Sequence, residues 1–94
     1  MSWSVSAIGK PAAVKIALAK QFESAKNSTK NMPHENESVG AIETIVNGEL
    51  DFLAARTNPL AVQVTGSGSA YYSSDGTGST QLQFEVKPIH GFVE

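Results

Sequence analysis

Residues 61–87 read AVQVTGSGSAYYSSDGTGSTQLQFEVK, and this stretch decides the fold. Polar and apolar side chains alternate from Ala61 to Tyr71 and again from Thr80 to Lys87, which is the period of a half-buried strand. Between these runs, residues 73–78 combine glycine, which accepts positive φ, with an aspartate that can hydrogen-bond its own backbone. The stretch therefore predicts a β-hairpin.

The same alternation assigns the two faces of this hairpin. Leu82, Phe84 and Val86 should point toward a core, and Gly66 and Gly68 continue the inner face of the preceding strand. The sequence GSGS at 66–69 also resembles a phosphate-binding loop, but no helix follows it and no Lys-Ser/Thr pair ends it. We interpret it as a strand notched by glycine.

A further strand and a helix are expected upstream of the hairpin. Residues 2–8, SWSVSAI, alternate in the same way and predict a strand. Pro11 suits the first turn of a helix because its missing N–H would be unpaired there, and this helix should run to about Ala25. Its apolar stripe consists of Val14, Leu18 and Phe22.

A second helix is expected from about Glu37 to Arg56. The polar segment Asn27 to Asn36 before it, which contains Pro33, reads as an exposed connection, and Asn58-Pro59 should end the helix. Gly48 lies inside this helix, where it indicates either close packing against another backbone, which we favour, or a weak point. The apolar stripe comprises Val39, Ile42, Ile45, Val46, Leu50 and Leu53.

These elements predict an α+β fold of order β-α-α-β-β in a single domain, residues 1–94. Two antiparallel helices return the chain to the end of the sheet that it left, so the second strand should oppose the first and the third should run parallel to the first. Pro88 should end the pairing of the third strand. The result is a two-layer sandwich in which two antiparallel helices cover one face of a three-stranded sheet.

Composition restricts where the protein works and what it binds. The 94 residues include no cysteine, and no leader or run of about 18 apolar residues occurs, so we expect a cytoplasmic protein without a membrane span. Residues 1–34 carry five lysines against one glutamate, and residues 35–94 carry two basic against eight acidic residues. We interpret this as two oppositely charged helices lying side by side, in preference to a basic patch for an anionic ligand.

No residue pattern points to catalysis, a metal or a cofactor. His34 and His90 are the only histidines and are far apart in the chain. Glu49 and Asp51 are two positions apart on a helix and therefore lie on different faces. No serine occupies a nucleophile elbow, and we expect the protein not to be an enzyme.

Binding residues are instead expected on the sheet face that the helices leave uncovered. That face is rich in hydroxyl and amide groups and poor in charge, which permits docking of a partner or of a second copy, and either open strand edge would allow a homo-oligomer. Tyr72, with Lys26 and Lys30, would contribute if an oligomer enclosed a small anionic ligand. The candidate residues on the face itself are Thr65, Ser67, Ser69, Tyr71, Gln81 and Gln83.

The two ends of the chain carry a resemblance to known proteins. The opening MSWSVSAIGK, residues 1–10, and the ending PIHGFVE, residues 88–94, with a helical middle between them, are similar to small proteins of tailed bacteriophages and prophages. This resemblance implies a context only: such accessory proteins bind a host or defence protein, sequester a nucleotide signal, or assist assembly.

Four functions follow as hypotheses. The first is a non-enzymatic accessory or anti-defence inhibitor that binds a host protein stoichiometrically. The second is an oligomeric sponge that sequesters a signalling nucleotide. A single-stranded nucleic-acid binder is the third, although the net charge of −2 opposes it, and a virion structural protein is the fourth.

Overall fold

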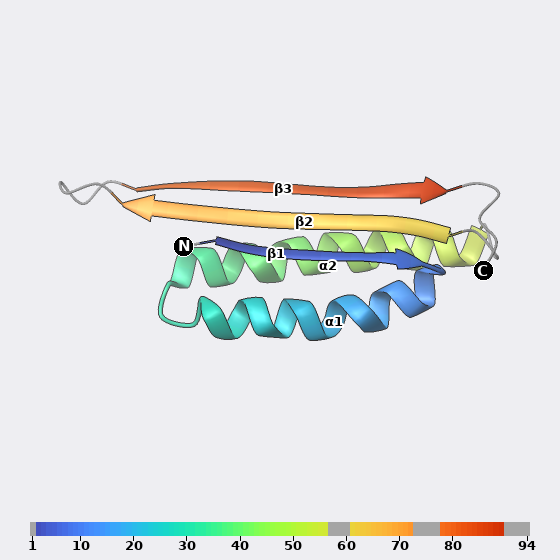
Figure 1. Ribbon diagram of the computed structural model, residues 1–94, viewed down its shortest axis with the longest axis horizontal. Coiled ribbons are helices and arrows are strands. Elements are labelled where there is room, and N and C mark those ends of the chain that lie inside the picture. The colour runs from blue at the N-terminus through green and yellow to red at the C-terminus, as the bar shows by residue number, and fades with distance from the viewer. Residues whose placement is uncertain (1, 57–60, 73–77, 90–94) are drawn as a thin grey trace.

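The computed structural model describes residues 2–56, 61–72 and 78–89 and has the expected order β-α-α-β-β (Figure 1). The elements are β1 (Ser2–Gly9), α1 (Pro11–Ser28), α2 (Pro33–Arg56), β2 (Ala61–Tyr72) and β3 (Gly78–Ile89). Within these residues, neither helix has the length and apolar character needed to cross a membrane.

The three strands form one antiparallel sheet in the order β1-β2-β3. Ser2 of β1 pairs with Ser69 of β2, and Gly9 pairs with Val62. On the other side of β2, Tyr72 pairs with Gly78. β2 and β3 therefore extend together past the start of β1, as Figure 1 shows at the hairpin end of the sheet.

The core lies between the helix layer and one face of the sheet, as the alternation predicts. The ring of Trp3 on β1 packs against Phe22 of α1 with centroids 6.4 Å apart and planes tilted by 58°, a geometry that aromatic pairs favour. The buried cluster comprises Trp3, Val5, Val14, Leu18, Phe22, Ala25, Val39, Ile42, Val46, Leu50, Val62 and Val64.

The connection between the helices is shorter than the sequence predicts. α1 continues to Ser28, and α2 begins at Pro33 instead of Glu37, so that only residues 29–32 lie between them. Pro33 opens the helix, where its missing N–H has no intrahelical partner to lose. The Asn36 side chain then donates to the carbonyl of Lys26 at 2.9 Å, joining the start of α2 to the last turn of α1.

The prediction that Pro88 ends the pairing is wrong. β3 runs from Gly78 to Ile89, and Pro88 pairs with Val62 of β2. An edge strand accepts proline when the nitrogen that lacks hydrogen faces away from the neighbouring strand. The expected turn at residues 73–78 falls largely outside the described residues, as does the helix stop at Asn58-Pro59.

The glycines of β2 and the glycine of α2 have different surroundings. A Cβ at Gly68 would lie 2.4 Å from Nε1 of Trp3, so the notch in β2 makes room for the indole ring. A Cβ at Gly48 would meet nothing within 4 Å. The close-packing interpretation of Gly48 is therefore wrong within the chain, because this part of α2 faces outward.

Opposite charges on the two helices meet, as the charge distribution predicts. Lys15 of α1 pairs with Asp51 of α2 at 2.9 Å, and Lys26 of α1 pairs with Glu43 of α2. The Lys15–Asp51 pair is exposed, so it contributes at most about 1 kcal/mol. The pairs show which faces of the helices adjoin.

A side chain of α1 closes the outer edge of β1, which the sequence does not predict. Oε1 of Gln21 accepts from the N–H of Ser6, and Nε2 of Gln21 donates to the carbonyl of Ser6, both at 2.8 Å. The amide thus takes the place of a neighbouring strand. Gln21→Ala should lower the free energy of unfolding by about 1–2 kcal/mol, because two hydrogen bonds are lost.

Urea denaturation measures this loss, with Lys20→Ala as the matched control. Lys20 is the preceding residue of α1 and its side chain is exposed. Its replacement should change the free energy of unfolding by less than about 0.5 kcal/mol. Equal transition midpoints for the two variants would show that Gln21 does not stabilise the edge.

Candidate binding surface

The sheet face opposite the helices consists of four rows of side chains, which we call the outer face. Cross-strand register places residues of β1, β2 and β3 side by side in each row, about 5 Å apart. The rows are Ser2, Ser69 and Gln81; Ser4, Ser67 and Gln83; Ser6, Thr65 and Glu85; and Ile8, Gln63 and Lys87.

Nearly all of these side chains are exposed, and the most central, Ser67, is half-buried. Among the described residues, no hydrogen bond joins a side chain of the outer face to another protein group; the bonds at Ser6 use its backbone. Hydroxyl and amide groups both donate and accept. The outer face therefore offers hydrogen-bonding groups of both kinds that only solvent or a partner can use.

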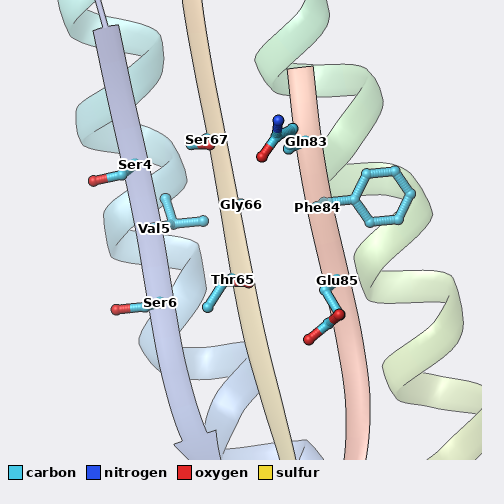
Figure 2. Close-up of a pocket in the computed structure, with 9 residues that line it drawn as sticks. All are labelled: Ser4, Val5, Ser6, Thr65, Gly66, Ser67, Gln83, Phe84 and Glu85. Atoms are coloured by element: carbon cyan, nitrogen blue, oxygen red, sulfur yellow. The ribbon is translucent and has the colours of Figure 1, made fainter. Parts of the chain in front are cut away.

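An open depression crosses the two middle rows (Figure 2). Its volume is about 470 Å³, and its polar lining comes from all three strands. Ser4 and Ser6 extend from β1 away from β2 in Figure 2, and the ring of Phe84 extends from β3 away from β2, over α2 in this view. The polar lining residues are Ser4, Ser6, Thr65, Ser67, Gln83 and Glu85.

The outer face brings together five of the residues expected from sequence. Thr65, Ser67, Ser69, Gln81 and Gln83 occupy its first three rows. This agreement follows from the period of two, because a strand with one buried face presents every second residue to the other side.

The remaining four candidates lie elsewhere or outside the described side chains. Lys26 lies in α1, where it pairs with Glu43, and Lys30 follows α1 in the connection, so both belong to the helix layer on the opposite side of the sheet. Tyr71 and Tyr72 belong to β2 beyond the start of β1, but their side chains fall outside the described part. One chain therefore does not join the two lysines to the outer face.

The electrostatics of the outer face are weak. Glu85 and Lys87 carry its only charges, and they are of opposite sign. Without clustered cations the face has no electrostatic preference for phosphate groups. Its contacts to a ligand would be hydrogen bonds and van der Waals contacts.

A second surface, which the sequence does not predict, lies between α2 and β3. An apolar groove of about 570 Å³ runs there, and Gly48 of α2 contributes to its wall. Ile45, expected in the core stripe of α2, is 46% exposed beside it. The groove is lined by Thr44, Ile45, Gly48, Glu49, Phe52, Leu53, Val86 and Pro88.

Within the ranges 2–56, 61–72 and 78–89, no group of three or more His, Asp or Glu side chains is placed to hold a metal ion. Comparisons with protein-family models, curated proteins and solved structures gave no match for this chain.

Proposed function

We propose that this chain is a non-enzymatic interaction protein that binds a partner protein stoichiometrically through its outer face. The carrying observation is the set of exposed hydroxyl and amide side chains on three strands that form no hydrogen bonds with other residues in the described ranges. Solvated sheet faces usually carry Lys and Glu, which discourage association. Here the two central rows contain a single charge, that of Glu85.

The form of the outer face supports a protein over a small molecule as its partner. Small ligands bind in concave sites that bury most of their surface, whereas this face is an open sheet with a depression at its centre. A protein surface with its own donors and acceptors can satisfy several rows at once. The expected partner surface is polar and low in charge, and the similarity of the termini to phage proteins leads us to propose a host protein in the cytoplasm.

The nucleotide sponge is the less supported function. Lys26 and Lys30 would have to reach the outer face of another copy, since within one chain they lie on the opposite side of the sheet. Isothermal titration with linear and cyclic nucleotides separates the two functions. Heat at a defined stoichiometry would favour the sponge and contradict the protein-binding proposal.

Thr65→Lys tests the proposal in the middle of the outer face. Thr65 lies between Ser6 and Glu85, so the new ammonium and its long side chain would cover both central rows. Tagged protein expressed in a susceptible host is recovered with its partner, which is identified and quantified by mass spectrometry. We expect at least a tenfold loss of the partner, equivalent to about 1.4 kcal/mol of binding free energy.

Ala19→Lys is the matched control for this experiment. Ala19 is exposed on α1 in the layer opposite the outer face, and the substitution adds the same charge. It should leave partner recovery unchanged. Equal recovery with Thr65→Lys and Ala19→Lys, or no partner recovered with the wild-type protein, would contradict the proposal.

A further inference from the structure

The two outer edges of the sheet are not equivalent. At the β1 edge, the amide of Gln21 occupies both the N–H and the carbonyl of Ser6. Along β3, no side chain among the described residues forms a hydrogen bond with the strand backbone. An edge strand presents a row of N–H and C=O groups that can pair with another chain unless something covers them. The β1 edge is therefore covered at Ser6, whereas the described side chains supply no such cover along β3.

The helix layer also covers the two sides of the sheet unequally. α1 lies along β1 and reaches its edge through Gln21, and β3 is the strand farthest from α1 (Figure 1). α2 lies against β3, yet Leu82 and Phe84 of β3 remain 42% and 41% exposed, whereas Trp3 and Val5 on the same face of β1 are buried. The predicted inward orientation of Leu82 and Phe84 is right, but one chain does not bury them.

The open edge and the apolar groove are continuous. Val86 of β3 lines the groove that Ile45 and Gly48 border from α2, and Leu82 and Phe84 precede it on the same face of β3. Gly48 leaves open space where a larger side chain would project. This side of the molecule thus combines half-exposed apolar side chains with strand-edge backbone groups for which the described residues supply no partner, as an interface between subunits does.

We propose that a second copy of this chain covers this side, with the two β3 strands paired antiparallel about a two-fold axis at Phe84. The dimer then contains a continuous six-stranded sheet with four helices on one face, and Leu82 of each copy lies opposite Val86, at the margin of the other copy's groove. An antiparallel pair of identical strands satisfies two-fold symmetry, because each strand offers the other the same surface.

Like charges exclude two of the possible registers, and an axis at Phe84 pairs the apolar side chains of β3 most completely. An axis at Glu85 would place two carboxylates opposite each other, and an axis at Lys87 would do the same with two ammonium groups; like charges directly opposite destabilise a sheet. An axis at Phe84 places Gln83 opposite Glu85 of the second copy. It also places Leu82 opposite Val86 of the second copy, so the apolar side chains of both strands form one patch.

The available area agrees with a dimer of moderate strength. Residues 81–89 of β3 extend about 30 Å, and the molecule is 19 Å deep across its short axes. The product, on the order of 600 Å², is the largest flat area that this side can present, and it is smaller than the roughly 800 Å² per partner of a standard interface. A small domain with a thin core gains stability from such an interface.

Sedimentation equilibrium over a range of concentrations tests the dimer. The wild-type protein should change from 9.9 kDa to twice that mass as its concentration rises. Leu82→Lys places a charge in the middle of the apolar patch, and we expect the dimer dissociation constant to rise at least 30-fold. Gln83→Lys is the control on the adjacent outer-face position, where the new cation faces Glu85 of the second copy; it should leave the dissociation constant within threefold.

Single cysteines test the register, since the wild-type chain contains none. Phe84→Cys should form a disulfide-linked dimer on copper-catalysed air oxidation, because residues that face each other across an antiparallel pair lie within disulfide reach. Leu82→Cys, equally exposed on the same face, should not, because the two copies of residue 82 would be about 13 Å apart.

Three results would overturn the proposal: a wild-type monomer at all concentrations, a dimer that Leu82→Lys does not weaken, or cross-linking of Leu82→Cys in preference to Phe84→Cys. Circular dichroism checks that each variant is folded. The test is independent of the outer-face proposal, because Thr65→Lys should abolish partner binding and leave the dimer intact, whereas Leu82→Lys should dissociate the dimer whether or not a partner binds.

Discussion

Gly68→Ala is expected to lower the free energy of unfolding by about 2–3 kcal/mol, the upper part of the range of about 1–3 kcal/mol for overpacking a core. The added Cβ would lie 2.4 Å from Nε1 and 2.7 Å from Cε2 of Trp3, and 3.0 Å from Cδ2 of Leu82. The indole is a rigid ring buried against Phe22, so it cannot move aside without losing that contact. Urea denaturation measures the loss.

Backbone entropy alone predicts that Gly68→Ala raises the free energy of unfolding. Replacing glycine by alanine where the backbone permits it stabilises a protein by about 0.4–1 kcal/mol, because the unfolded chain loses freedom. Gly68 has no positive φ, so this gain applies to it as well. The steric cost should exceed the gain, and a net stabilisation would show that Trp3 does not lie over Gly68 as described.

Two other glycines supply the controls. At Gly66 the new Cβ would meet Cγ2 of Val5 at 3.2 Å, a contact that a shift of a few tenths of an ångström relieves, so Gly66→Ala should be close to neutral. At Gly40 in α2 nothing lies within 4 Å, and alanine should stabilise the helix by about 0.5–1 kcal/mol. Gly68→Ala should therefore be the most destabilising of the three variants, Gly66→Ala close to neutral and Gly40→Ala stabilising. This order would identify the contact with the indole ring as the cause of the loss.

A double-mutant cycle with Trp3→Phe checks the cause. Phenylalanine lacks Nε1, the atom nearest to the added Cβ. Trp3→Phe alone should be destabilising because it leaves a cavity, but Gly68→Ala should cost less in that background than in the wild-type protein. Additive losses would mean that the two residues do not interact.

The period of the polar pattern predicts most of this fold. The polar and apolar residues of the sequence indicate which side chains face water. They predict the alternation along the three strands and the apolar stripe of α1, which consists of Val14, Leu18 and Phe22. The outer face follows from the same rule. Its members Thr65 and Gln83 are therefore found where the alternation places them.

The misjudged boundaries involve proline. Pro33 begins a helix and Pro88 continues a strand, whereas the sequence pattern predicts that both lie outside regular structure. Proline is compatible with the first turn of a helix and with an edge strand, and only tertiary context shows whether such a place exists. Local propensity could not decide between these alternatives.

The sequence also does not predict the contacts that distinguish the two edges of the sheet. Gln21 is an ordinary polar residue of an amphipathic helix, and its bonds to Ser6 depend on how far α1 is displaced toward β1. Phe84 and Ile45 are half-exposed, although both fit the core pattern of their elements. Periodicity assigns a face to a residue but does not state whether anything covers that face.

Leu18→Ala should lower the free energy of unfolding by about 3 kcal/mol or more, within the range of 2–5 kcal/mol for buried leucine. Leu18 lies in α1 and is fully buried among the side chains of the core. A domain of this length has a total stability of about 5–14 kcal/mol. The variant should therefore unfold at a much lower temperature, by roughly 12 °C or more.

Ile16→Ala is a closely matched control for Leu18→Ala, because isoleucine and leucine are isomers and the two positions are two residues apart on α1. Ile16 is 69% exposed, so its truncation removes little buried area, and alanine favours the helix by a few tenths of a kcal/mol. Its free energy of unfolding should stay within about 0.5 kcal/mol of the wild-type value. Both variants are compared at one protein concentration, since a dimer makes the transition depend on concentration. Similar losses in the two variants would mean that α1 does not pack on the sheet through the face that carries Leu18, and the hydrogen bonds of Gln21 to the edge of β1 would then lose their basis.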